Sequence, residues 1–76
     1  MKDNTYNGWK NYETWNVSMW IQNDEGFYSV AQECDEVGDF IDFVMSNGHT
    51  ETPDGVEWDS WKIDYEAIDE VIQSIN

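Results

Sequence analysis

The chain has 76 residues, 39% of them hydrophobic, and a formal net charge of −14. A chain of this length forms one small domain and buries only about 60% of its unfolded surface, which excludes a deep active-site cleft behind a lid. It has no apolar run of 18 residues and no basic-then-apolar start, so we expect one acidic helical domain over residues 1–76 in the cytoplasm, with no membrane partner.

The first predicted element is a helix over residues 11–22. Asn11 is a favoured N-cap residue, and large apolar side chains follow it at helical spacing. They are Tyr12, Trp15, Met19 and Trp20. Each aromatic side chain can bury about 150–250 Å², so we expect this face to supply much of an aromatic core. The turn residues Asn7-Gly8 predict that Tyr6 and Trp9 fold back onto the helix.

Two further helices are predicted before residue 48. The segment Asn23-Asp24-Glu25 provides a new N-cap, and Phe27, Val30, Ala31 and Cys34 follow at helical spacing. The pattern restarts near Val37-Gly38, where Phe40, Ile41 and Val44 share a helical face and Asn47-Gly48 suits a left-handed C-cap. A strand is the alternative for this third segment, because Ile41 and Phe43 also alternate.

A long irregular connection over residues 49–62 leads to the last predicted helix. Thr52-Pro53-Asp54-Gly55 is a strong turn signal, and residues 56–58 could form a short extended piece. Asp64 then caps a helix with an amphipathic pattern, formed by Tyr65, Ile68, Val71, Ile72 and Ile75. The fold class is therefore predicted to be all-α: a small compact domain of three to four short helices around an aromatic core.

The negative charge is concentrated after residue 23. Residues 1–23 are neutral overall, because Lys2 and Lys10 balance Asp3 and Glu13, whereas Lys62 alone accompanies all remaining acids. Two acidic rows follow from the predicted helices. The first is Glu33, Asp35, Glu36, Asp39 and Asp42, at the end of the second helix and the start of the third. The second is Asp64, Glu66, Asp69 and Glu70, on the outer side of the last helix.

The two acidic rows predict a non-enzymatic inhibitor or decoy. Helix neighbours three or four residues apart lie about 5–6 Å from each other. A nucleic-acid strand presents one charge per about 3.4 Å, so the rows can imitate a phosphate track and occupy a basic, nucleic-acid-binding surface. The competing interpretation is that the acids only keep an aromatic-rich protein in solution. Direct nucleic-acid binding is excluded, because three lysines and no arginine cannot neutralise phosphates.

Trp58 and Trp61 form a second candidate surface in the long connection. Tryptophan is enriched at binding hot spots, so these two could form an aromatic patch that binds a partner. The competing interpretation is that both cover the core, since tryptophan is usually largely buried.

The sequence predicts no catalytic residue, no metal site and no cofactor. Its one histidine, His49, has no oriented partner for nucleophilic catalysis and is interpreted as an exposed loop residue. Asp3 could begin a calcium loop, but Thr14 stands where that loop requires a bidentate glutamate. The single Cys34 has acidic neighbours that disfavour a thiolate, so we expect it to fill the core.

The segment GWKNYETWNV at residues 8–17 resembles a family of small proteins of unknown function from bacteriophages, cyanophages among them, and their hosts. Further segments that share the resemblance lie at residues 20–21, 23–26, 52–56 and 63–65. The resemblance implies a bacterial host cell and brings no activity. In that setting the leading hypothesis is a phage-type inhibitor of a host protein with a basic surface. The alternative is a binding module that modulates a specific host metabolic or photosynthetic protein through the aromatic patch.

Overall fold

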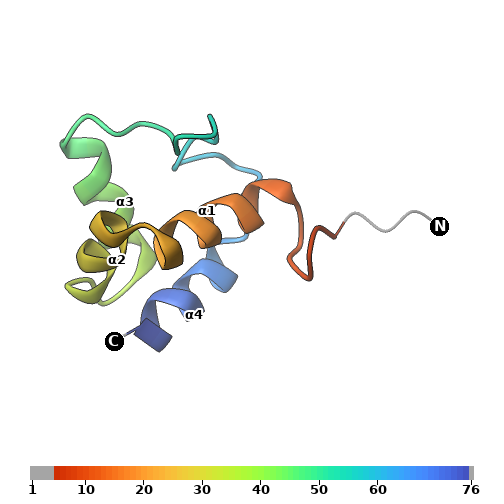
Figure 1. Cartoon of the computed structure of the whole chain (residues 1–76), viewed down its shortest axis with the longest axis horizontal. Helices are drawn as coiled ribbons and strands as arrows, with labels where there is room; N and C mark the ends of the chain where they lie inside the picture. Colours follow the sequence, from red (N-terminus) through yellow and green to blue (C-terminus); the bar gives the residue numbers. More distant parts are fainter. Residues whose placement is uncertain (1–4, 76) are drawn as a thin grey trace.

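The computed structural model describes residues 5–75 and shows an all-α fold (Figure 1). The helices are α1 (Tyr12–Asn23), α2 (Glu25–Gln32), α3 (Val37–Ser46) and α4 (Tyr65–Ile75). Within residues 5–75 β-pairing is limited to two isolated bridges, Tyr6 with Trp9 and Glu51 with Glu57. The all-α prediction is confirmed, and the strand alternative for the third segment is wrong. Lys2 and Asp3, which enter the charge count above, lie outside the described residues.

The predicted helix caps of the first half are confirmed. The Asn11 Oδ1 accepts a hydrogen bond from the Thr14 N–H at 2.9 Å, and the Asp24 Oδ1 accepts one from the Phe27 N–H at 3.1 Å. Asp24 also ends α1, since its own N–H donates to the Trp20 carbonyl. One residue therefore separates α1 from α2, and the chain turns sharply there. None of the four helices is long and apolar enough to cross a membrane.

The start of α3 is capped from another helix. Glu36 is the N-cap residue by its backbone, but its side chain makes no capping hydrogen bond. The Val37 N–H instead donates to Oδ1 of Asp69 on α4, at 2.9 Å. This bond joins α3 to α4 at the point where α3 begins.

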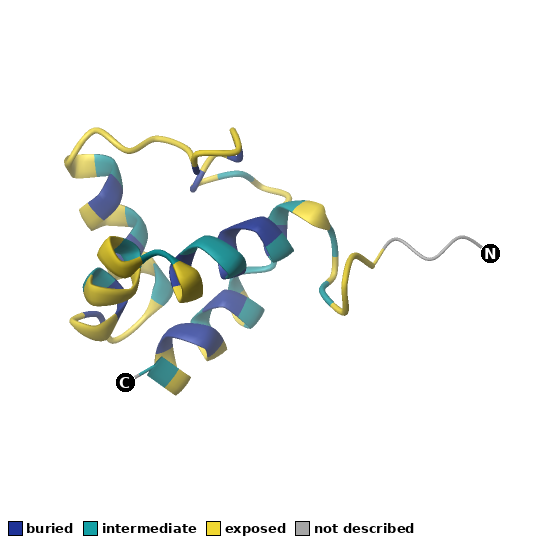
Figure 2. Ribbon diagram, in the orientation of Figure 1, coloured by how far each residue is buried: buried dark blue, intermediate teal, exposed yellow. Residues whose placement is uncertain are grey.

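The hydrophobic core draws on all four helices and the loop before α4. Buried apolar residues come from α1 (Val17, Ile21), α2 (Ala31), α3 (Phe40, Val44), α4 (Ile68, Val71, Ile72) and the loop (Val56, Trp58, Ile63). Figure 2 shows the buried stretches of α1 and α4, whereas most of α2 is exposed. The Trp58 ring lies edge-on to Phe27 at 5.1 Å and to Phe40 at 5.3 Å between ring centroids. A loop tryptophan therefore joins α2 to α3.

The expected buried face of α1 is wrong. Its aromatic side chains and Met19 are half-buried or exposed. The buried residues of α1 are instead Thr14, Asn16, Val17, Ser18 and Ile21. Positions 14, 17, 18 and 21 also recur at helical spacing, and their side chains are smaller. Smaller side chains let neighbouring segments approach α1 closely, so the aromatic side chains flank the contact rather than fill it.

The N-terminal turn folds back as predicted. Asn7 and Gly8 have φ values of 49° and 87°, which is the left-handed geometry of a two-residue type I′ turn. Tyr6 and Trp9 exchange two backbone hydrogen bonds of 2.8 Å across it. The Tyr6 ring then packs against Trp15 with centroids 4.9 Å apart. This flap covers the outer aromatic side of α1.

Candidate functional site

The first acidic row lies at the junction of α2 and α3. Its members Glu33, Asp35, Glu36, Asp39 and Asp42 are all exposed. Three of them lie near the buried Cys34. Burial raises the pKa of the Cys34 thiol, and the negative charges of Asp39, Asp35 and Glu33 raise it further. These carboxylates therefore gather around one point of the surface, and the thiol stays protonated and core-filling as expected.

One residue of the second acidic row, Asp69, lies at the start of α3, and only part of the second row is exposed. Asp69 caps α3 through Oδ1, and its Oδ2 accepts a hydrogen bond from Gln73 at 3.1 Å. Asp64 accepts a long bond of 3.4 Å from the Ala67 N–H and caps α4. Both are half-buried, whereas Glu66 and Glu70 are exposed. Asp64 and Asp69, which the sequence predicted to bind a partner, are therefore helix caps. Glu66 and Glu70 remain on the surface.

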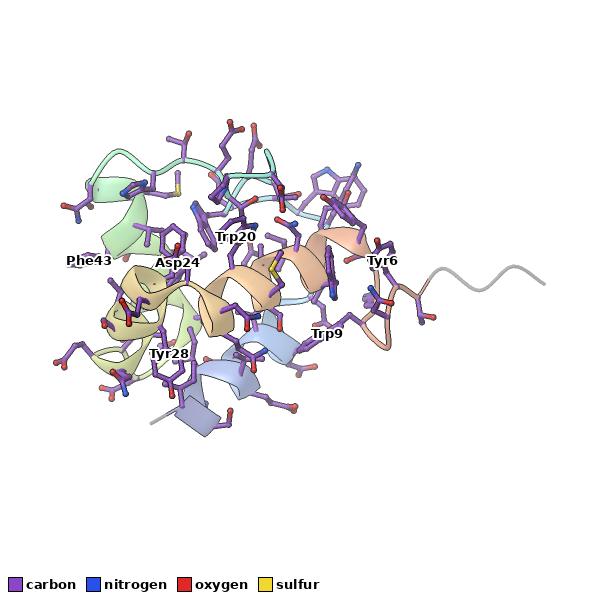
Figure 3. All side chains as sticks on the ribbon, viewed as in Figure 1. Tyr6, Trp9, Trp20, Asp24, Tyr28 and Phe43 are labelled. Carbon is purple, nitrogen blue, oxygen red and sulfur yellow. The ribbon has the colours of Figure 1, made fainter. Side chains whose placement is uncertain are left out.

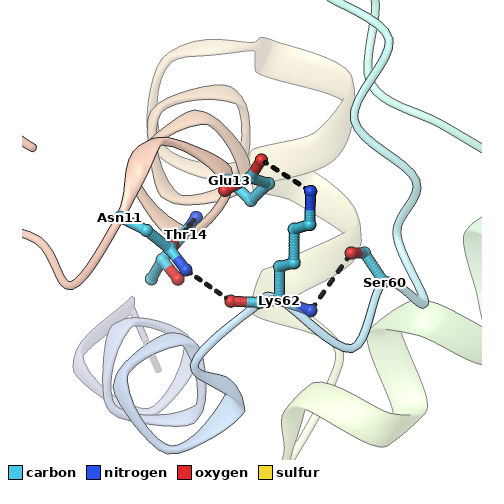
Figure 4. Close-up of polar contacts among 5 residues, drawn as sticks. All are labelled: Asn11, Glu13, Thr14, Ser60 and Lys62. Carbon is cyan, nitrogen blue, oxygen red and sulfur yellow. Dashed lines mark hydrogen bonds and ion pairs between the residues drawn. The ribbon is translucent and has the colours of Figure 1, made fainter. Parts of the chain in front are cut away.

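No cation neutralises the acidic rows within residues 5–75. The one ion pair there joins Lys62 Nζ to Glu13 Oε2 at 3.9 Å, beside the N-terminus of α1 (Figure 4). Lys10 directly precedes the same helix end. The described lysines therefore lie at one end of α1, and the α2–α3 junction lies beyond its other end (Figure 1). Acidic residues also lie at the lysine end, where Glu13, Asp54, Glu57 and Asp59 line one hollow together with Lys62.

The predicted pairing of Trp58 and Trp61 in one patch is wrong. Trp58 is 0% exposed and belongs to the core, whereas Trp61 is 87% exposed. The indole N–H of Trp58 has no hydrogen-bond partner among the described residues. Trp61 lies in a polar groove that Tyr12 also lines. An aromatic surface in this region would therefore consist of Trp61 and Tyr12.

The backbone beside Trp61 is held by α1. The Asn11 Nδ2 donates to the Lys62 carbonyl at 2.7 Å, and the Lys62 N–H donates to the Ser60 Oγ at 3.2 Å (Figure 4). Lys62 Nζ also lies 5.8 Å from the Trp61 ring centroid. Trp61 is thus an exposed side chain on an anchored turn.

Sequence reasoning missed a polar network between α1 and the long loop. Asn16 is fully buried, and its Nδ2 donates to Asp54 Oδ2 at 2.8 Å while its Oδ1 accepts from the Thr52 hydroxyl at 2.7 Å. The Trp20 Nε1 donates to the same Asp54 oxygen at 2.9 Å. The Thr52 hydroxyl oxygen also accepts the Val56 N–H at 3.1 Å. The sequence signal for this network was Asn16 itself, because an asparagine that is buried on a helix needs hydrogen-bond partners.

The hydrogen bonds from Asn16 and Trp20 lower the pKa of Asp54 below its usual value. A lowered folded-state pKa stabilises the fold above the unfolded pKa of about 4, and this contribution is lost as the pH falls through the folded pKa. We expect Asp54→Asn to lower the melting temperature at pH 7. The gap in melting temperature between the wild type and the variant should narrow below about pH 4, where the wild-type carboxyl also becomes neutral.

Thermal unfolding followed by circular dichroism across that pH range measures this gap. Glu57→Gln removes the same charge from the same loop and is the matched control, because any relief of charge repulsion is common to both variants. A gap for Asp54→Asn that stays constant with pH would contradict the assignment.

The described part of the chain does not bring side chains together into a catalytic or metal-binding arrangement. His49 is exposed and lies edge-on to Phe27, with ring centroids 5.9 Å apart. Within residues 5–75 no three His, Cys, Asp or Glu side chains are grouped so that they could hold a metal ion. Burial and the charge of Asp59 raise the pKa of Tyr65, whose hydroxyl lies 2.7 Å from the Trp58 carbonyl and 3.0 Å from that of Ser60. This tyrosine is a structural donor.

Comparison with known proteins gives one match. A model of a family of unknown function, DUF7249, matches residues 2–76. No curated protein and no solved structure matches the chain. The function must therefore be inferred from the geometry of the surface.

Proposed function

Because the chain belongs to DUF7249, a family of unknown function, its role must be inferred from its surface, and we propose that it is a non-enzymatic acidic inhibitor or decoy. It binds the basic, nucleic-acid-binding surface of a host protein and imitates the charge of DNA. The resemblance of residues 8–17 to small phage and cyanophage proteins supports a phage origin and action in the cytoplasm of a bacterial host.

The observation that carries the proposal is the exposed, unneutralised first acidic row at the α2–α3 junction. Three of its carboxylates lie around Cys34, and the Asp69 bond to Val37 brings that one residue of the second row to the start of α3. Asp39 and Asp42 lie on α3, whereas Glu33, Asp35 and Glu36 lie in the short connection between α2 and α3. The two helices hold this connection at both ends, which limits the freedom that it loses on binding. The negative charge of the junction attracts a cationic surface and raises the association rate at low salt.

The near absence of lysine favours binding over mere solubility. Solubility is served by interspersed positive and negative charges. Here the described lysines lie beside the start of α1, and the junction carries acids alone. A basic partner that approaches the junction therefore meets no opposing lysine among the described residues.

The test compares two variants with the same net charge. The junction variant carries Asp35→Asn, Glu36→Gln and Asp42→Asn; the control carries Glu25→Gln, Glu57→Gln and Asp59→Asn. Each immobilised protein is exposed to a bacterial lysate, and the retained proteins are identified at low and high salt. We expect the wild type and the control to retain nucleic-acid-binding proteins at low salt, and salt or added duplex DNA to release them. The junction variant should lose them.

Equal losses in the two variants would show that net charge alone attracts the captured proteins. Retention by the junction variant would contradict the proposal directly. Circular dichroism of each variant confirms that the helices are intact before binding is compared.

The second candidate function is a module that binds a host metabolic or photosynthetic protein through an aromatic surface. The exposure of Trp61 on an anchored turn favours it, because a rigid exposed tryptophan loses little freedom on binding. Capture that is insensitive to salt and lost on Trp61→Ala would select this function over the acidic decoy.

A further inference from the structure

A surface hollow lies between α2, α3 and the loop. It has a volume of about 740 Å³, and its apolar lining is formed by Phe27, Val30, Phe43, Val44 and Pro53. A second hollow of about 390 Å³ is lined by Val30, Cys34 and Phe43 together with polar neighbours. Val30 and Phe43 line both hollows, so the two are adjacent, and together they are called the α2–α3 groove.

Phe43 is the exposed apolar residue of this groove. Phe40 and Val44 occupy the buried side of α3, while Phe43 is 52% exposed (labelled with Asp24 in Figure 3). Exposed apolar surface in a continuous groove is a feature of binding sites rather than of ordinary protein surface. Covering Phe43 would remove this apolar area from water.

The rim of the groove is acidic. Asp24 and Glu51 line the larger hollow, and Glu33 and Asp39 line the smaller one, whereas no lysine lines either. A second copy of this chain would bring the same charges against these carboxylates, which is unfavourable at a net charge of −14. Charge complementarity therefore selects an occupant that is cationic at its edges and apolar at its centre.

We propose that the α2–α3 groove binds a short amphipathic segment of a partner protein, with apolar side chains over Phe43 and lysine or arginine on either side. The inference rests on the proposed function, since it takes the partner to be basic, and adds that the partner is recognised through an apolar anchor. The segment presents one apolar side chain to each hollow, on either side of Val30 and Phe43. Its basic side chains reach the carboxylates of the rim.

Charge attraction alone and docking in the groove predict opposite effects of Phe43→Glu. The substitution removes the apolar side chain and adds one more carboxylate to the rim. If binding were purely electrostatic, a basic peptide would bind equally well or more tightly. If the groove receives an apolar anchor, binding should weaken by about tenfold or more. Tyr28→Glu makes the same charge change on α2, outside both hollows, and is the matched control.

The probes are two labelled synthetic peptides with the same number of lysines. One carries leucines at i and i+4, and in the other serines replace them; binding to the full chain is followed by fluorescence anisotropy. We expect the leucine peptide to bind about tenfold more tightly than the serine peptide, and Phe43→Glu to abolish that preference while Tyr28→Glu retains it. The preference should persist at high salt, where the attraction common to both peptides is screened.

The outcomes separate the two proposals. Equal binding of the two peptides, with no effect of Phe43→Glu, would overturn the groove and leave the acidic decoy standing. Binding of a neutral leucine peptide as tightly as the basic one would support docking at Phe43 but overturn the basic partner. Circular dichroism of both variants excludes unfolding as the cause, and Phe43→Ala repeats the loss of the anchor without a change in charge.

Discussion

Trp58→Ala is expected to destabilise the fold by about 3–5 kcal/mol, the usual cost of truncating a buried aromatic residue. Trp58 is fully buried and links Phe27 of α2 to Phe40 of α3 through edge-on ring contacts. A domain of this length has a total stability of about 4–11 kcal/mol, so the loss is a large fraction of it. Urea unfolding followed by far-ultraviolet circular dichroism measures the change.

Trp61 is the matched control, because it lies three residues away in the same loop and is 87% exposed. Trp61→Ala should change the free energy of unfolding by no more than about 0.5 kcal/mol. A comparable destabilisation of both variants would contradict the placement of the two tryptophans. Such a result would also weaken the case for Trp61 as an exposed hot spot.

Asn16→Ala is expected to destabilise the fold by about 2–3 kcal/mol, because it removes hydrogen bonds at a fully buried site and leaves a small cavity. The Thr52 hydroxyl loses its acceptor, and the Asp54 carboxylate loses one of its donors. Asn23→Ala at the exposed end of α1 is the control and should remain within about 0.5 kcal/mol of the wild type. Chemical unfolding of both variants checks the difference.

Asn16→Asp gives the same site a second, independent test. The new carboxylate would face the Asp54 oxygen that Asn16 Nδ2 contacts at 2.8 Å, so two negative charges would meet where a hydrogen bond was. Stability should be low at pH 7 and should recover as the pH falls, since a protonated carboxyl can donate a hydrogen bond again. Asn16→Ala should not recover in this way. Equal pH profiles for the two variants would contradict the network.

The Asn16 network also bears on the groove. Thr52 and Pro53 line the larger hollow, and Thr52 is held by Asn16 of α1. The loop wall of the groove is therefore positioned by a buried side chain that no partner touches. Residues 8–17 and 52–56 both lie within the family match, and the two segments meet in this network.

Helices and their ends followed from the sequence because the forces that set them are local. Asn11 and Asp24 cap their own helices through hydrogen bonds that span three residues. Asn7-Gly8 forms the predicted turn for the same reason, since it depends on the φ angles of two adjacent residues. The amphipathic pattern of α4 likewise specified its buried face.

Long-range packing decided what these local rules left open. The aromatic stripe of α1 competes with a stripe of smaller side chains one step around the helix, and the closer approach of the neighbouring segments selects the latter. Trp58 and Trp61 have the same chemistry and lie three residues apart, but only the former meets Phe27 and Phe40. Asp69 caps α3 although it lies 32 residues from Val37 in the sequence, and no local pattern predicts a contact over that separation.

By itself, the sequence determined the four helices, most of their caps, the neutral first segment and the acidic remainder. Only the tertiary structure decided which face of α1 is buried, which tryptophan is exposed, which acids are used as caps, and that an apolar groove lies among the acidic rows. The physical reason is range: caps, turns and periodicity act within one or two helical turns. The burial of a side chain, and the charges that lie near it, depend instead on contacts between residues that are distant along the chain.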